Sequence, residues 1–402
     1  MLGAGGRGPG AGCRVLGAGC YEVLSDQTRA SSTKAPSTEH PALGTRHRLV
    51  AVMNESKSSR YHRAKRRAGL VQLAWGGALL SAMLWMRPSL SLSVYVLSLA
   101  VLHEVVALPV VFYATFVLER RYELSTEPFG TWIKDHLKAF AIATSFGLAA
   151  AHGVYALIRW MPVWWWLAAA VAGTGVTILL ARLAPVVLLP LFYRFVPLDR
   201  PALNERLVAL SGRAGVPVLG VYEWALGAKT RRANAALVGA GATRRILLSD
   251  TLLADYSDDE IEVILAHELG HHVHHDIPKG LAMEFAVLLA AFYGAAAALR
   301  TFGAPLGLGG PGDVAGLPVV LLALGAVSLA ATPLLYALSR TNERRADRFA
   351  LSVTKRPDAF ITAMRRLGSQ NLSEENPSRA TVWMFHTHPP MEERIVAARM
   401  PQ

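Results

Sequence analysis

Six long apolar blocks constrain this chain more than any other feature of its sequence. Each is long enough to cross the hydrocarbon core of a bilayer, which takes about 17–25 helical residues. Hydrophobic residues make up 52% of the 402 residues, and charged residues only 17%. We therefore predict a mainly α-helical, polytopic membrane protein with about six transmembrane helices. The blocks cover residues 70–86, 90–118, 140–158, 163–192, 281–299 and 316–338.

The blocks divide the chain into three predicted regions. Residues 1–66 are rich in Gly, Ser, Thr, Ala and Arg without periodicity, and we expect a disordered basic tail there. Met53 opens a polar-basic segment within that tail and is a candidate alternative start. Residues 67–195 form an N-terminal transmembrane domain of four spans. Residues 196–402 form a polar domain of helices with a small β-hairpin or sheet, and this domain includes two further spans at about 281–299 and 316–338.

The charge pattern points to a membrane rather than to nucleic acid. The formal net charge is +12, but Lys and Arg lie mostly in short stretches beside the apolar blocks. That placement is typical of membrane orientation, so we expect a bilayer and no nucleic acid as partner. Loops on one side carry only Arg87, Arg159 and Arg300, and the other basic segments gather on the opposite side. We therefore expect an integral protein of the cell membrane, with both termini and the polar domain in the cytoplasm.

Ionisable residues inside the apolar blocks include His103, Glu104, Arg182 and Glu284. Charges at membrane depth are costly, so such residues usually face a protein interior or a wet cavity. The alternative is that some of them sit at a helix end and reach the interface.

The sequence His267-Glu-Leu-Gly-His271 carries the main chemical signal. Ser257 and Glu260 form a capping box, so a helix should begin just before this motif. On that helix His267 and His271 are i and i+4 and share one face. Two imidazoles so placed can bind one zinc ion, and Glu268 between them can reach a zinc-bound water.

Zinc catalysis needs a third protein ligand, and Glu343 is the candidate. It follows the sixth apolar block, and Asp347 lies one turn further on. Glu343 would complete a two-His, one-Glu site, and Asp347 would accept the free N–H of a ligating imidazole. Arg340, one turn before Glu343, would pair with Asp347 or hold a substrate carboxylate. The alternative is that residues 339–347 are simply a charged helix face in contact with solvent.

Together these motifs resemble the integral-membrane zinc endopeptidases of the type I CAAX prenyl protease family. The resemblance rests on the His267–His271 motif paired with Ser339-Arg-x-x-Glu343-x-x-Ala-Asp347, and it extends over about residues 70–399. Its best-known members have seven spans, whereas six are counted here. Further similar stretches are Arg121-Tyr-Glu-Leu-Ser-Thr, Trp132 to Lys138, Asn234-Ala, Arg245 to Leu253, and His388-Pro with Glu392, Glu393 and Arg394.

The resemblance implies hydrolysis of peptide bonds with one zinc ion per chain. Glu268 would be the general base that takes a proton from the water and returns it to the leaving amine. His388 and Asn234 match positions that the family keeps near its active site, and they are candidate donors to the oxyanion. The alternatives for them are a loop histidine and a turn asparagine. The expected substrate is a peptide or protein, either lipidated or embedded in the membrane.

Residues 235–239 and 245–249 are short apolar runs separated by Gly and polar residues, which predicts a β-hairpin. Its exposed edge would align an extended substrate by β-augmentation. The nearby His272, His274 and His275 leave the face of His267, so we expect a polar helix end there rather than a second metal site.

Two other functions compete with the CAAX-type endopeptidase. A quality-control peptidase of the same zinc clan would use identical chemistry on misfolded membrane proteins. A metal transporter or sensor would use the histidine tract without catalysis, but a transporter should place its ligands midway through apolar spans. No Cys-based site competes, because Cys13 and Cys20 both lie in the predicted tail.

Overall fold

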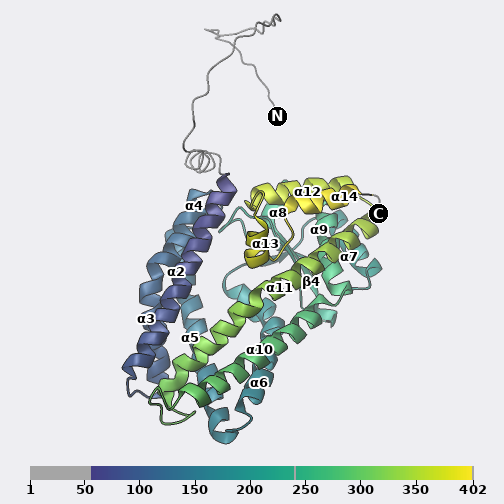
Figure 1. Cartoon of the computed structure of the whole chain (residues 1–402). Helices are drawn as coiled ribbons and strands as arrows, with labels where there is room; N and C mark the ends of the chain where they lie inside the picture. Colours follow the sequence, from purple (N-terminus) through teal and green to yellow (C-terminus); the bar gives the residue numbers. More distant parts are fainter. Residues whose placement is uncertain (1–55, 240, 401–402) are drawn as a thin grey trace, which may run out of the picture. The chain divides into compact units, whose positions relative to one another are not determined.

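The computed structural model describes residues 56–239 and 241–400, and these residues form one compact unit (Figure 1). In that part of the chain six helices are long and apolar enough to cross a membrane, which confirms the predicted fold class and count. Only 11–28% of each apolar window is buried, as expected of helices whose outer faces meet lipid. The six helices are α2 (Lys57–Met86), α3 (Leu92–Phe112), α5 (Phe129–Trp160), α6 (Trp165–Leu183), α10 (Asp276–Phe302) and α11 (Leu317–Thr354).

Helix α2 begins well before its apolar block, and the prediction of a disordered tail up to residue 66 is wrong for residues 57–66. Ser56 caps the helix, because its Oγ accepts a hydrogen bond from the backbone N of Ser59 (3.2 Å). Tyr61 is only 2% exposed, so this polar end of the helix is packed against other elements. Polar composition alone did not reveal that contact. The remaining predicted tail, residues 1–55, lies outside the described residues.

Two of the ionisable residues in the spans contact neighbouring spans. Glu104 Oε1 on α3 lies 2.6 Å from His136 Nε2 on α5. Thr177 on α6 donates a hydrogen bond to Glu284 Oε1 on α10 (2.6 Å). Both carboxylates are therefore satisfied by protein, as the cost of a lipid-facing charge requires.

The chain between the fourth span, α6, and the fifth, α10, contributes the strands of a small mixed sheet. The strand order in this sheet is β1-β2-β4-β3. β2 and β4 are parallel, and β3 pairs with β4 as the predicted antiparallel hairpin, with Ala235 opposite Leu248. β3 is an edge strand of this sheet. The strands are β1 (Phe195–Pro197), β2 (Val221–Trp224), β3 (Ala235–Val238) and β4 (Arg245–Ser249).

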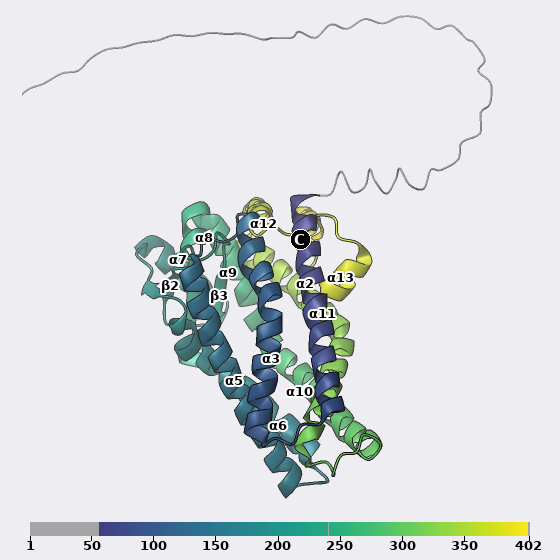
Figure 2. The same ribbon diagram turned by 90° about the vertical axis from the view of Figure 1, so that its left-hand side faces the viewer.

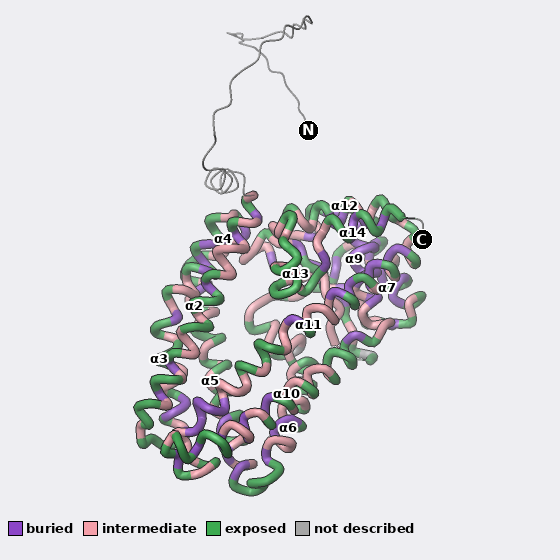
Figure 3. The backbone as a smooth tube through the Cα atoms, viewed as in Figure 1, coloured by how far each residue is buried: buried purple, intermediate pink, exposed green. Residues whose placement is uncertain are grey.

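Helix α9 (Asp258–Val273) crosses this part of the molecule and is buried along most of its length. It begins at the predicted capping box, in which Ser257 and Glu260 satisfy each other's backbone N–H groups. Its apolar side packs with β4 and α7 (Pro201–Arg213) in one core. Figure 3 shows one group of buried residues around α9 and a second group where the far ends of the long helices meet, whereas most of the length of those helices is exposed or half-buried.

The C-terminal elements close over α9 and α11. Helices α12 (Pro357–Gln370) and α14 (Met391–Arg399) share the core with α9, whereas α13 (Arg379–Phe385) has no buried residue. In Figure 2, α12 and α13 lie at the same end of the unit as the start of α2. The remaining helices are the short α4 (Leu118–Arg121), which continues α3 through a π-helical turn, and α8 (Asp250–Asp255).

Candidate metal centre

Three predicted metal ligands converge where α9 meets α11. His267 Nε2 and His271 Nε2 lie 3.3 Å apart on one face of α9. Glu343 on α11 reaches both imidazoles, with Oε2 3.3 Å from His267 Nε2 and Oε1 3.4 Å from His271 Nε2. One donor atom from each of the three lies within 4.8 Å of the others. This arrangement could hold a single metal ion.

The convergence depends on a close crossing of the two helices at Gly270. A Cβ atom built on Gly270 would lie 2.9 Å from Ala346 Cα on α11, closer than real Cβ contacts come. Glycine therefore lets the backbones approach and brings Glu343 within reach of both imidazoles.

Each imidazole is oriented through its other ring nitrogen. His267 Nδ1 lies 2.9 Å from Asp347 Oδ1, the carboxylate that the sequence analysis placed there. His271 Nδ1 lies 2.9 Å from Asp276 Oδ2, which the sequence analysis missed. These contacts direct both Nε2 atoms toward Glu343.

The donor set fits a divalent cation. Glu343 Oε2 is buried and has no hydrogen-bond partner among the described residues. A buried carboxylate whose two oxygens face two different imidazole nitrogens is a costly arrangement unless a cation satisfies it. Two imidazoles and one carboxylate are also the protein ligands of many catalytic zinc sites, which keep a fourth position open.

Burial and charge shift the protonation of the helix α9 residues. Burial raises the pKa of Glu268 above its usual value, an effect that the neighbouring His267 and His271 only partly offset. For His267, burial by itself lowers the pKa, but the neighbouring carboxylates of Asp347 and Glu343 outweigh it and raise the pKa to about 9. Protons and a metal ion therefore compete for this imidazole.

Two arginines occupy positions near the ligands. Arg394 on α14 donates two hydrogen bonds to Asp347, from Nε (2.8 Å) and Nη2 (2.6 Å), and so fixes that carboxylate. Arg340 instead donates to the backbone carbonyl oxygens of Val382 (3.0 Å) and His386 (2.7 Å). The predicted alternative in which Arg340 pairs with Asp347 is thus not the arrangement observed, because Arg394 takes that position.

A pocket of about 620 Å³ opens beside this cluster. Glu268, His388 and Asn234 all line it, so it brings together the predicted general base and both candidate oxyanion donors. His388 Nε2 lies 3.3 Å from Glu343 Oε1, close to the three ligands. Asn234 stands at the start of the edge strand β3, where its backbone N donates to Ser249 Oγ (2.9 Å).

The pocket also has a wall that sequence reasoning missed. His62, Lys65 and Arg66 line it from α2, although the sequence analysis assigned all three to a disordered tail. The only available signal was their basic character beside the first apolar block. Asp276 was missed for a different reason. It follows His275, whose left-handed backbone (φ 55°) turns the chain between α9 and α10, so helical spacing does not apply there.

The histidine tract, which comprises His272, His274 and His275, lies at the C-terminal end of α9, as predicted. His272 lies in its last turn, and His274 is the residue that caps the helix. Among the described residues, neither belongs to the group that His267, His271 and Glu343 form.

Two protein-family models match the chain. The model of peptidase family M48 matches residues 197–402. A model of the CAAX prenyl protease N-terminal region, described as five membrane helices, matches residues 53–194. The structure described here has four candidate spans in that second range.

Curated relatives cover most of the chain. A Bacillus subtilis protein described as the uncharacterized metalloprotease YhfN is 32% identical over 68% of this chain and 65% of its own length. CAAX prenyl protease 1 of Saccharomyces cerevisiae is 26% identical over 74% of this chain and 70% of its own length. The chain thus spans about two thirds of the length of these relatives. The crystal structure of S. mikatae Ste24p has the same fold, with a TM-score of 0.73 at 23% identity over 86% of this chain and 88% of that one.

Proposed function

The chain belongs to peptidase family M48, and on that premise we propose that it is a zinc-dependent membrane endopeptidase of the CAAX prenyl protease type. The family predicted from the sequence is confirmed by the matches to both family models. One observation carries the proposal. His267, His271 and Glu343 converge at one point. His267 of this group and the neighbouring Glu268 line a pocket large enough for a peptide segment.

His267, His271 and Glu343 are the proposed ligands of one zinc ion per chain. The Nδ1 atoms of His267 and His271 contact Asp347 and Asp276, so the Nε2 atom of each imidazole is left to bind the ion. When bound, the ion supplies Lewis acidity, which polarises the scissile carbonyl and makes a water molecule more acidic.

The chain's own residues supply the proton transfers. Glu268 accepts a proton from the attacking water and later donates it to the leaving amine. His388 and Asn234, which line the same pocket, are the proposed donors to the oxyanion.

The edge strand β3 offers a way to align the substrate. Asn234 and Ala235 line the pocket at the start of this strand, and β3 has a partner only on its β4 side. An extended peptide lying along β3 would gain backbone hydrogen bonds and pass the proposed zinc ligands.

The proposed substrate is a peptide or protein, lipidated or embedded in the membrane, and nucleic acid is not an expected partner. Six spans anchor the chain in a bilayer. We propose that it resides in the cell membrane with the zinc domain facing the cytoplasm, because the basic segments gather on that side.

The test compares purified wild type with Glu268→Gln on two substrates, a farnesylated CAAX peptide and an unfolded membrane protein. We expect kcat to fall by roughly 10²–10⁴-fold in the variant with zinc content unchanged, because only a proton-transfer group is removed. Equal activity of the two proteins would refute the mechanism. Cleavage of the unfolded protein but not of the CAAX peptide would favour a quality-control peptidase of the same clan.

A further inference from the structure

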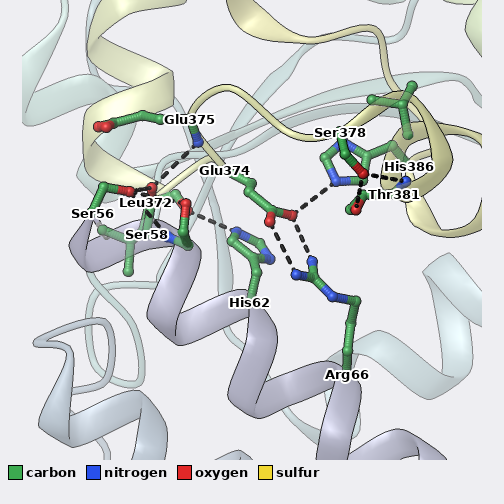
Figure 4. Close-up of polar contacts among 12 residues, drawn as sticks. Ser56, Ser58, His62, Arg66, Leu372, Glu374, Glu375, Ser378, Thr381 and His386 are labelled. Atoms are coloured by element: carbon green, nitrogen blue, oxygen red, sulfur yellow. Dashed lines mark hydrogen bonds and ion pairs between the residues drawn. The ribbon is translucent and has the colours of Figure 1, made fainter. Parts of the chain in front are cut away.

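One face of α2 holds the segment that follows α12 (Figure 4). Ser58, His62 and Arg66 are spaced four residues apart, so they line one side of the helix. Ser58 Oγ accepts from the backbone N of Glu375 (3.3 Å), and His62 Nε2 lies 2.9 Å from the carbonyl oxygen of Leu372. Arg66 completes the row with an ion pair to Glu374.

Glu374 joins α2 to the residues that lead into the pocket. Arg66 donates to it from Nη1 (2.6 Å) and Nη2 (3.0 Å), and His386 Nε2 lies 3.1 Å from its Oε2 (Figure 4). The Glu374 side chain is only 6% exposed. Burial by itself would raise the pKa of Glu374, but the bonds from Arg66 and His386 outweigh it and hold the pKa below its ordinary value.

His386 is held from two directions. Its ring faces Glu374, and its carbonyl oxygen accepts a hydrogen bond from Arg340 on α11 (2.7 Å). His388 follows two residues later, with its Nε2 3.3 Å from Glu343 Oε1. The position of His386 therefore limits where the His388 ring can lie.

Polar contacts, rather than a hydrophobic core, hold this segment. Helix α13 has no buried residue, and Trp383 and Phe385 are 55% and 45% exposed. A short helix with so little apolar burial depends on its hydrogen bonds and ion pairs for a fixed position.

We propose that Arg66, Glu374 and His386 form a positioning triad that fixes His388 beside the metal ligands. Through Arg66, the first membrane helix, α2, would then contribute to the geometry of the active site. The inference rests on the role proposed above for His388. Within it, Glu374 is the central residue, because it is the only one of the three that contacts both of the others.

The first test is Glu374→Gln, which keeps the size of the side chain and removes its charge. We expect kcat to fall about tenfold to hundredfold with unchanged zinc content, the usual range for residues that orient a catalytic group. Glu123→Gln is the matched control, because it removes the exposed Lys57–Glu123 pair (2.8 Å) at the same end of α2 and should leave kcat unchanged. His386→Ala should lose activity like Glu374→Gln while the Arg66–Glu374 pair, and with it the fold, stays intact.

The deciding test adds Glu374→Gln to His388→Ala. If Glu374 acts through His388, the double variant is no slower than His388→Ala alone. Backbone hydrogen exchange of residues 379–388 should also become faster in Glu374→Gln and in His386→Ala.

Three results would overturn the triad: full activity of both single variants, an added loss in the double variant, or unchanged exchange. Failure of the triad stays distinct from failure of the proposed function. If only the triad fails, Glu268→Gln and His388→Ala are still impaired. If the proposed function fails, Glu268→Gln is fully active.

Discussion

The two imidazoles that face Glu343 depend on carboxylates behind them. His267 uses Asp347, which Arg394 fixes in turn, and His271 uses Asp276 at the start of α10. A carboxylate in this position sets the tautomer of the ring and strengthens it as a ligand. The two supporting carboxylates come from different helices, so they can be tested separately.

Asp276→Asn should weaken zinc binding while leaving the ligands themselves in place. We expect the zinc Kd to rise about tenfold to hundredfold, because the amide no longer stabilises the bound imidazole as a carboxylate does. Competition with a chelator measures it. Lys279→Met is the control, since it removes the Lys279–Asp276 contact (3.6 Å) and a hydrogen bond to the carbonyl oxygen of His274 (2.5 Å) but leaves the carboxylate of Asp276 beside His271. Equal affinity of Asp276→Asn and wild type would show that Asp276 has no such role.

The raised pKa of Glu268 is a prediction for the zinc-free protein. Burial raises the pKa of this carboxyl group, so in the zinc-free protein it should titrate above the ordinary value of 4.5. Bound zinc would lower that pKa, because a nearby positive charge favours the ionised carboxylate. An NMR titration of the zinc-free protein, with Glu268→Gln to assign the signal, measures it. A midpoint at or below 4.5 in the zinc-free protein would contradict the buried placement of Glu268.

Two predictions together gave most of the cluster. His267 with His271, and Glu343 with Asp347, are i, i+4 pairs on two helices, and the need for a third zinc ligand joined the two pairs. Asp276 lies beyond a left-handed turn, and Glu374 is brought to Arg66 by packing between residues 308 positions apart. Nothing local in a sequence encodes such a contact.

At the scale of elements, the crossing of α9 and α11 builds the site. Gly270 lies at the closest approach, against the backbone of Ala346. A Cβ atom at position 270 would collide with the backbone of Ala346, which cannot move aside as the end of a flexible side chain can.

Gly270→Ala should separate α9 from α11 and disturb both stability and zinc binding. We expect a loss of about 1–3 kcal/mol, the typical cost of overpacking, together with a higher zinc Kd. Thermal unfolding with and without zinc measures both. Gly212→Ala in α7 is the matched control, because a Cβ there meets nothing within 4 Å. A Gly270→Ala protein as stable as wild type would contradict the crossing.

The edge strand β3 should be sensitive to proline if it binds the substrate backbone. Proline scanning of residues 235–239 should raise KM at one or more positions where the outward N–H is lost, without lowering the melting temperature. Unchanged turnover along the whole strand would remove β-augmentation from the account.

Elements with a local signal were predicted well. The capping box at Ser257 marked the start of α9, and two short apolar runs on either side of a Gly-rich segment marked the β3–β4 hairpin. The start of α2 was not predicted, because residues 57–66 are polar and are ordered by contacts with distant residues such as Glu119 and Glu374.

At the scale of the whole molecule, six spans and the placement of basic residues predict a cytoplasmic zinc domain. Single cysteines test this orientation after Cys13 and Cys20 are replaced by serine. In intact cells a membrane-impermeant maleimide should label Ala304→Cys, beyond the end of α10, but not Arg365→Cys on α12 until the cells are lysed. The reverse pattern would contradict the orientation.

The most direct test of the central claim is an anomalous difference map of the purified protein, recorded at the zinc absorption edge. We expect a single peak about 2 Å from the Nε2 atoms of His267 and His271 and from a carboxylate oxygen of Glu343. No peak at that point, or a peak at His272, His274 and His275 instead, would contradict the account.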